Sequence, residues 1–407
     1  MAQGNSDLLR HFCWTSQKSL ENQADVSLTL AKHILLNRGK DSNVVFSPIS
    51  IQVILGMIAG GASGQTLDQL LWFLKASSIE EVHYIYSHIV HLVFANGSLP
   101  DGPNLSIANF VWLEQTLSLR PSFKQVLDTY KASCQRVDFK NKAEEVRNLV
   151  NSWVETVTNN LVKQILPPNS VGRDTKLILA NALYYKGTWS SEFDASRTMH
   201  FDFHLLNGQL VQVPFMTRTK KRELSAFDGF KVLKLPYKQG GTQSSGEPSF
   251  SMYIYLPNAK DGLPALVERA GSESGFLDRY IPYQEINAGM FWIPKFKFEY
   301  EIELSEALKS LGLASPFDPN VGLMQIVDNF RPLFVSKIYH KSFIEVDESG
   351  TEAAAATVAV MLLGGFAPSR QEFRIDFVAD HPFLYVIRED KTGIVQFIGQ
   401  VLNPSAT

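Results

Sequence analysis

The segment from Glu348 to Ser369 places the strongest constraint on how this chain can fold. It reads E-S-G-T-E-A-A-A-A-T-V-A-V-M-L-L-G-G-F-A-P-S and lies between Phe343–Val346 and Phe373–Val378, two segments rich in β-branched and aromatic residues that predict strands. Four consecutive alanines favour a helix, whereas the glycine and threonine before them and the β-branched residues after them do not. Two interpretations therefore stay open: an alanine-rich surface loop or short helix, and a strand.

As a strand the segment has two different faces, because successive side chains of an extended chain point to opposite sides. One face carries small residues first and larger ones later: Thr351, Ala353, Ala355, Thr357, Ala359, Met361 and Leu363. The opposite face carries the only charge after the glycine: Glu352, Ala354, Ala356, Val358, Val360 and Leu362. Such a segment can enter a sheet between two strands without burying a charge or a bulky side chain. Gly350 gives the backbone freedom of a hinge, and Gly364–Gly365 forms a flexible, cleavable point.

The rest of the chain predicts strands and helices without the regular alternation of parallel α/β proteins. Expected strands are Leu105–Leu113, Lys176–Trp189, Leu210–Phe215, Phe230–Tyr237, Ser251–Leu256 and Phe291–Glu299. Expected helices are Asp25–Leu36, one that starts at Pro48 and is apolar on nearly all sides, one after Ser78, Ala143–Leu161 and Ser305–Leu311. Because no linker, repeat or change of composition divides the 407 residues, we expect a single α+β domain over residues 1–407.

Charge and cysteine content exclude several classes of protein. A net charge of −3 argues against a general binder of nucleic acids or anionic membranes. The one basic run, Arg218–Arg222, predicts a solvated hairpin, and no apolar run is long enough to span a membrane. Cys13 and Cys134 exclude a disulfide framework and show no metal-binding spacing. With no signal-peptide profile at the N-terminus, we expect a cytoplasmic protein, with release to the extracellular space or apoplast as the alternative.

Several motifs together resemble one family. V-D-E-S-G-T-E-A-A-A-A-T at Val346–Thr357 is similar to the hinge of the reactive-centre loop of inhibitory serpins. Further similarities are F-S-P-x-S at Phe46–Ser50, N-A-L-Y-Y-K-G-T-W at Asn181–Trp189, I-P-K-F at Ile293–Phe296 and F-V-A-D-H-P-F-L-Y-V-I at Phe377–Ile387. They extend over residues 25–404, and G-F-K-V-L-K-L-P-Y at Gly229–Tyr237 resembles the plant branch. The resemblance implies the serpin fold, with three β-sheets, surrounding helices and an exposed reactive-centre loop over residues 350–374.

The resemblance also assigns roles to particular residues. The hinge is Gly350, Thr351, Glu352, Ala353, Ala354, Ala355, Ala356 and Thr357. Ser47, Ser50, Asn181 and His340 are assigned to a polar cluster beneath the opening of the main sheet, the shutter, and Trp189 to the top of that opening, the breach. The alternative is that these five are ordinary buried residues with local hydrogen bonds. If His340 is a partner of Asn181, we expect His340→Ala to leave a buried amide short of a hydrogen bond and to promote loop–sheet polymers.

An inhibitor is favoured over an enzyme and over a carrier. No nucleophile elbow, zinc-protease motif, phosphate loop or dinucleotide fingerprint occurs, so we expect no enzymatic activity, metal or cofactor. Non-inhibitory serpins that act as carriers or chaperones tend to have charged, bulky or proline residues in the hinge, whereas the inserting face here is small. The resemblance implies a monomer that inhibits by loop insertion and forms a covalent acyl complex with its target protease. The expected targets are serine proteases, with papain-like cysteine proteases as a second class.

The position of the scissile bond depends on which end of the loop is used for counting. The spacing usual in the family, counted from Gly350, places the bond between Gly364 and Gly365. The segment from Gly365 to Phe377 is about two residues longer than in the plant relatives it resembles, so that counting back from Phe377 places the bond at Phe366–Ala367. A glycine before the bond disfavours trypsin-like targets; Leu362 or Leu363 suits papain-type enzymes, and Phe366 suits chymotrypsin-like enzymes.

Overall fold

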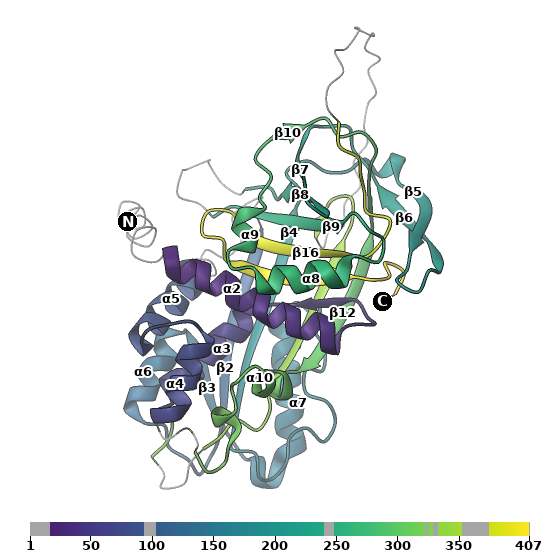
Figure 1. Ribbon diagram of the computed structural model, residues 1–407. Coiled ribbons are helices and arrows are strands. Elements are labelled where there is room, and N and C mark those ends of the chain that lie inside the picture. Colours follow the sequence, from purple (N-terminus) through teal and green to yellow (C-terminus); the bar gives the residue numbers. More distant parts are fainter. Residues whose placement is uncertain are drawn as a thin grey trace, which may run out of the picture.

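The structure, a computed structural model, describes residues 17–92, 103–239, 248–321, 323, 325–328, 333–351 and 374–406 (Figure 1). These residues form three β-sheets and a set of helices around them. The α+β fold with three sheets is therefore confirmed. Among the described residues, no helix combines the length and the apolar character needed to cross a membrane.

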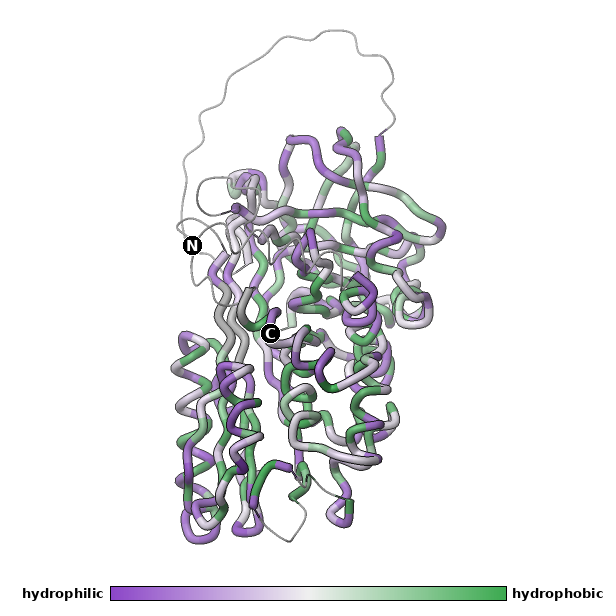
Figure 2. The backbone as a smooth tube through the Cα atoms, turned by 90° about the vertical axis from the view of Figure 1, so that its left-hand side faces the viewer, coloured by the Kyte–Doolittle hydropathy of each residue, from purple (hydrophilic) through white to green (hydrophobic). Residues whose placement is uncertain are grey.

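Five of the described helices correspond to segments expected from the sequence, although the first begins at Gln17, eight residues before the expected start at Asp25, and four further helices were not predicted. In chain order the helices and helical turns are α2 (Gln17–His33), a π-helical turn (Ile34–Arg38), α3 (Pro48–Gly60), α4 (Gly64–Phe73), α5 (Ile79–Leu92), α6 (Pro121–Thr129), α7 (Phe139–Val157), a 3₁₀ turn (Ala195–Arg197), α8 (Leu263–Ser272), α9 (Phe276–Arg279), α10 (Ser305–Ser310) and a 3₁₀ turn (Ser315–Phe317). Hydrophobic and hydrophilic residues alternate along the helices in Figure 2, as expected where one side of a helix is buried.

The strands are described sheet by sheet, in their order across each sheet. The six-stranded sheet consists of β12 (Phe296–Glu303), β13 (Tyr339–Val346), β14 (Gly350–Thr351), β4 (Leu177–Thr188), β2 (Asn104–Glu114) and β3 (Ala132–Val137). The four-stranded sheet consists of β15 (Phe377–Val378), β11 (Phe291–Pro294), β6 (Leu210–Met216) and β5 (Met199–His204). The seven-stranded sheet consists of β1 (Val44–Phe46), β17 (Val395–Val401), β16 (Phe383–Glu389), β9 (Phe250–Pro257), β8 (Phe230–Pro236), β7 (Arg222–Phe227) and β10 (Glu285–Ile286).

The six-stranded sheet is covered on both faces, and β2 shows why. Val111 and Leu113 belong to the large central core, whereas Trp112 between them belongs to a second cluster with Val150 and Val154 of α7. Because neighbouring residues of a strand point to opposite faces, the central core and α7 lie on opposite sides of this sheet. On the core side, α3 contacts both β4 and β17 and so lies between the six-stranded and seven-stranded sheets.

Helix α3 starts where the sequence predicts. The hydroxyl of Ser47 accepts a hydrogen bond from the backbone N–H of Ser50, and Pro48 occupies the first turn. The residues from Pro48 to Ala59 are all buried, as expected for a helix without a polar face. Close packing on this helix requires Gly56, because a Cβ there would lie 2.6 Å from the Tyr130 hydroxyl.

The prediction of one strand over Phe291–Glu299 is wrong. The chain forms two strands in different sheets: β11 pairs with β6, and β12 pairs with β13. Pro294 explains the break, because it has no N–H to continue a ladder, and the N–H of Lys295 instead bonds to the carbonyl oxygen of Pro214 at 2.9 Å. Lys295 therefore stands where the four-stranded and six-stranded sheets meet.

The basic run Arg218–Arg222 is also only partly the solvated hairpin that was expected. Its two lysines are exposed, but Arg218 and Arg222 are buried. Arg222 donates to the carbonyl oxygens of Arg218 and Lys220, and its guanidinium carbon lies 3.7 Å from the ring centre of Phe291. Burial lowers the pKa of both arginines to about 10. The run therefore anchors the start of β7 instead of presenting a charged surface.

Candidate functional site

The point at which the hinge enters the six-stranded sheet is set by a tight turn after β13. The carboxylate of Asp347 accepts hydrogen bonds from the backbone N–H groups of Ser349 (2.9 Å) and Gly350 (3.1 Å). The N–H of Asp347 in turn donates to the carbonyl oxygen of Gly350 at 3.0 Å. Burial raises the pKa of Asp347, although these two N–H groups partly oppose the shift. The turn reverses the chain directly into the sheet.

Gly350 and Thr351 already form a short strand, β14, between β13 and β4. Gly350 pairs with Thr188 and Thr351 with Gly187 on one side, and Thr351 pairs with Val346 on the other. A Cβ at Gly350 would lie 2.1 Å from the carbonyl oxygen of Gly187, so this approach requires glycine. The first two hinge residues, expected in the exposed loop, are therefore buried in the sheet.

The side chain of Thr351 contacts two stacked aromatic residues through the hydroxyl of Tyr237. Thr351 is 4% exposed, and its hydroxyl lies 2.7 Å from that of Tyr237. Tyr237 stacks on Trp189, with ring centres 4.6 Å apart. Trp189 is fully buried and donates from its indole N–H to the carbonyl oxygen of Asp347 at 2.9 Å. Trp189, which the resemblance assigns to the breach, therefore lies beside the first two hinge residues and contacts Tyr237 and Asp347, which no motif had assigned.

An ion pair joins the turn to the neighbouring sheet. The carboxylate of Glu348 accepts from the ammonium group of Lys295 at 2.7 Å and from the hydroxyl of Thr198 at 2.6 Å. Burial opposes ionisation of Glu348, but the bonds from Lys295 and Thr198 outweigh it and lower the pKa. The signal for Glu348 was its place just before the hinge; Lys295 and Thr198 carried no sequence signal of their own.

Neutralising Glu348 should loosen this end of the sheet. We expect Glu348→Gln to lower the free energy of unfolding by about 1–2 kcal/mol, because it leaves Lys295 without its anion in a partly buried place. The matched control is Glu345→Gln, which breaks the more exposed Lys297–Glu345 pair between β12 and β13 and should change stability by less than about 0.5 kcal/mol. Urea unfolding of both variants measures the difference, and equal losses would contradict a special role for Glu348.

The four residues assigned to the shutter form two separate groups of hydrogen bonds. In the first, the Nε2 of His340 on β13 accepts from the backbone N–H of Ser47 (3.0 Å) and lies 2.8 Å from the hydroxyl of Ser342. The N–H of Ser50 donates to the hydroxyl of Ser47 at 3.3 Å. This group ties the start of α3 to β13.

The second group lies on β4 and β2. The side-chain amide of Asn181 donates to Asn109 at 2.6 Å, and that of Asn109 donates to the carbonyl oxygen of Tyr130 at 2.9 Å. The expected partnership of His340 with Asn181 is therefore wrong: Asn109, directly opposite Asn181 in the strand register, takes that place. Among the described residues, the buried Asn181 Oδ1 and Ser50 Oγ have no hydrogen-bond partner.

His340 should make the fold sensitive to acid. Burial lowers its pKa from 6.5 to about 4, so between these pH values the unfolded chain binds a proton that the folded chain does not. Stability is fully present above about pH 6.5 and falls as the pH drops towards 4, by at most about 3 kcal/mol. We expect His340→Gln to flatten this part of the profile relative to His200→Gln on the exposed start of β5. Unfolding curves between pH 4 and 7 measure it, and parallel profiles would refute the prediction.

The remaining site predictions concern residues that the structure does not describe. These are the hinge residues Glu352–Thr357 and both positions of the scissile bond, Gly364–Gly365 and Phe366–Ala367. The second predicted flanking strand, Phe373–Val378, is shorter than expected: β15 begins at Phe377, and Phe373 lies outside the described residues. Within the described part of the chain, no group of three or more His, Cys, Asp or Glu side chains could hold a metal ion.

Comparisons with known proteins agree with this geometry. The sequence model of the serpin family, described as serine protease inhibitor, matches residues 21–404. Serpin-ZX of Arabidopsis thaliana is 50% identical over 390 residues, which cover 95% of this chain and 98% of the relative. Serpin-ZXA of Oryza sativa subsp. japonica is 49% identical over 370 residues, 90% of this chain and 91% of the relative.

Solved structures show the same relationship. The native stressed conformation of Arabidopsis AtSerpin1 superposes with a TM-score of 0.86 at 48% identity and covers 96% of this chain and 99% of that chain. A cleaved Serpin 42Da superposes with a TM-score of 0.80 at 30% identity, over 95% of this chain and 99% of that chain. With the family model and the plant relatives both spanning nearly all of its length, this chain belongs to the serpin family and to its plant branch.

Proposed function

We propose that this serpin inhibits proteases by a suicide mechanism in which the cut loop enters the six-stranded sheet. The observation that carries the proposal is β14, because Gly350 and Thr351 already lie between β13 and β4 and pair with both. The two strands that flank β14 are much longer than β14 itself and extend past its end at Thr351: β13 comprises Tyr339–Val346 and β4 comprises Leu177–Thr188. A strand that continues from Thr351 would therefore meet a ladder partner on each side.

The energy available from such an insertion is large enough to act on a protease. A new central strand closing roughly a dozen ladder hydrogen bonds, at about 1 kcal/mol each, supplies on the order of 10 kcal/mol. This equals the stability of a typical domain. The small side chains at alternate hinge positions allow entry without a buried charge or a steric clash.

The covalent chemistry belongs to the protease. Its nucleophile attacks the carbonyl carbon of the residue before the scissile bond, the peptide bond breaks, and an acyl-enzyme forms while the new amine leaves with the C-terminal part of the loop. Insertion then moves the attached protease before water completes hydrolysis, and the displacement distorts its oxyanion hole. The inhibitor itself contributes no catalytic residue. Two target classes are proposed, serine proteases and papain-type cysteine proteases.

The decisive experiment is a titration with one protease of each class, for example chymotrypsin and papain, followed by denaturing electrophoresis. Inhibition by insertion gives a detergent-stable complex and a small released fragment. Cleavage without a complex would support the carrier alternative, and no cleavage at all would leave that protease outside the target range. A thioester to papain is expected to be less stable than an ester to chymotrypsin, so papain samples are quenched in acid.

The released fragment also locates the scissile bond. We expect its mass to correspond to a first residue of Gly365 with papain, because Leu363, the second residue before that bond, then fills the second pocket of the enzyme. A fragment that starts at Ala367 is expected with chymotrypsin, which prefers Phe366. Mass spectrometry of each reaction separates the two, and a fragment starting before Val360 would overturn both counts.

A further inference from the structure

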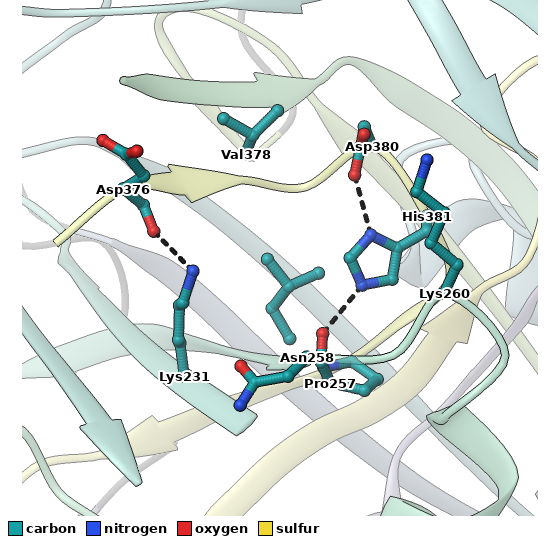
Figure 3. Close-up of a pocket in the computed structure, with 9 residues that line it drawn as sticks. Lys231, Pro257, Asn258, Lys260, Asp376, Val378, Asp380 and His381 are labelled. Carbon is teal, nitrogen blue, oxygen red and sulfur yellow. Dashed lines mark hydrogen bonds and ion pairs between the residues drawn. The ribbon is translucent and has the colours of Figure 1, made fainter. Parts of the chain in front are cut away.

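A cavity of about 460 Å³ lies beneath the strand that follows the reactive-centre loop (Figure 3). Its wall combines three parts of the chain: Asp376, Val378, Asp380 and His381 around β15; Lys231 on β8; and Leu256, Pro257, Asn258 and Lys260 at the end of β9 and after it. The cavity therefore joins the edge of the four-stranded sheet to the seven-stranded sheet. Its volume lies in the range of small-molecule sites.

The cavity has an apolar body. Most of its exposed lining comes from apolar atoms, with Val378 on the β15 side and Leu256 and Pro257 on the β9 side. Leu256 is 2% exposed and belongs to the central core, so this side of the wall is fixed by packing. A planar or branched hydrocarbon group can replace water here with a gain in free energy.

The two ammonium groups at the cavity contact a carbonyl oxygen and an imidazole nitrogen. The ammonium of Lys231 donates to the backbone carbonyl oxygen of Asp376 at 2.8 Å, and that of Lys260 lies 2.6 Å from His204 Nε2. Lys260 also acts on Asp380 through its charge: burial opposes ionisation of this carboxyl group, but the hydrogen bond from His381 and the neighbouring charges, that of Lys260 among them, outweigh burial and lower its pKa. Figure 3 draws the two lysines on opposite sides of the cavity.

Both carboxylates of the wall are already engaged. Asp376 accepts from the backbone N–H of Met290 at 2.7 Å. Asp380 lies 2.7 Å from Nδ1 of His381, whose Nε2 lies 2.8 Å from the carbonyl oxygen of Pro257. The wall therefore combines two carboxylates, each with hydrogen-bond partners of its own, and two ammonium groups, of which that of Lys231 is bound to an uncharged carbonyl oxygen.

We propose that this cavity is a binding site for a small carboxylic acid with an apolar, ring-sized body, and that the ligand fastens β15 to the seven-stranded sheet. The carboxylate would face Lys231 or Lys260, and the apolar body would lie between Val378 and Leu256. The proposed ligand is amphipathic. A free inorganic anion would leave the apolar part of the cavity unfilled, and an uncharged hydrocarbon would leave the lysines without a carboxylate.

β15 is already held by the burial of Phe377 in the central core and by polar contacts beside it, from Lys231 to Asp376 and from His381 to Pro257, and the ligand would add a further contact. The strand has two residues, lies at the edge of its sheet and pairs only with β11. Its amides reach β11 through two bonds, from Phe377 to Met290 (2.8 Å) and from Ala379 to Trp292 (2.9 Å). A ligand that contacts Val378 from the other side should suppress local opening of these bonds. The inference does not depend on protease inhibition.

The test uses 2-naphthoate as the acid and 2-naphthamide as its uncharged isostere, each titrated calorimetrically into the whole protein. We expect saturable binding of one naphthoate, with a dissociation constant below about 1 mM. The amide and the double variant Lys231→Met/Lys260→Met should each lose about tenfold in affinity. Lys163→Met, a lysine 64% exposed elsewhere, is the matched control and should bind as wild type does. Absence of saturation, or equal affinity of acid and amide, would overturn the site.

Hydrogen exchange separates ligand binding from its effect on β15 and covers the case in which the double variant is unstable. Saturating 2-naphthoate should slow exchange of the Phe377 and Ala379 amides in the wild-type protein by at least about threefold, whereas 2-naphthamide at the same concentration should slow it less. Unchanged exchange at these two amides under saturation would overturn the fastening of β15.

Discussion

Cutting the loop without trapping a protease is expected to raise the midpoint of thermal unfolding by at least about 10 °C. The inserted strand adds on the order of 10 kcal/mol of ladder hydrogen bonds. A chain of 407 residues has an unfolding entropy of about 0.9 kcal/mol/K near its midpoint, so this energy corresponds to about 12 °C. Burial of the hinge side chains adds to the shift.

The experiment needs a protease that cuts the loop but forms no acyl-enzyme. Thermolysin, a metalloprotease that cuts before large apolar residues, meets both conditions, because the loop offers Leu362, Leu363 and Phe366. Differential scanning calorimetry then compares intact and cut protein, with the cut confirmed by mass. Equal midpoints would mean that the loop does not enter the sheet, and would favour the carrier alternative over the inhibitor.

Sequence patterns alone predicted β4 and β13, the two strands that flank β14, but not the side-chain contacts that connect the turn after β13 to its neighbours. The apolar run around Asn181 and the pattern of Phe343–Val346 predicted β4 and β13, because strand periodicity is local. The Glu348–Lys295–Thr198 group joins residues from three distant parts of the chain, and no local pattern specifies such a meeting. Trp189 was assigned only through the resemblance.

Two errors have different origins, one a local signal that was outweighed and the other a feature with no local signal. Pro294 marked the break between β11 and β12, yet the apolar and aromatic residues on both sides suggested one continuous strand. The partner of Asn181 followed from strand register, since Asn109 stands opposite it, but register is fixed by tertiary packing and was not accessible from either strand alone.

The burial of Arg218 and Arg222 had no usable signal in the sequence. A dense basic run is usually solvated, and nothing in it distinguishes its arginines from its lysines. The structure shows the cause: Phe193 and Phe291 stack with their ring centres 6.0 Å apart, and the two guanidinium groups lie over these rings. Arginine suits such a place better than lysine because its planar group is more weakly hydrated.

Thr351→Arg should convert the protein from inhibitor to substrate. The threonine side chain is 4% exposed and bonds to Tyr237, which stacks on the fully buried Trp189. An arginine there places a charge among aromatic rings, and both carboxylates of the turn are already bound, Asp347 by two backbone N–H groups and Glu348 by Lys295 and Thr198. The penalty is several kcal/mol, about 2–5 by analogy with other unpaired buried charges. Because Thr351 lies in the sheet before any cleavage, we expect β14 to be displaced in the intact protein too.

The measurable result is a change in the fate of the acyl-enzyme, which either hydrolyses to release cut serpin or remains as the detergent-stable complex. Slower insertion gives water time to complete hydrolysis, so the variant should be cut at the same bond as wild type while the detergent-stable complex disappears. Thr351→Ser keeps the hydroxyl and should inhibit as wild type does, whereas Thr351→Val removes only the bond to Tyr237, worth about 1 kcal/mol. Titration of each variant against the same protease gives the stoichiometry of inhibition, which is the number of serpin molecules consumed for each protease molecule inhibited. If Thr351→Arg forms complex at the wild-type yield, entry of the hinge between β13 and β4 is not the inhibitory step.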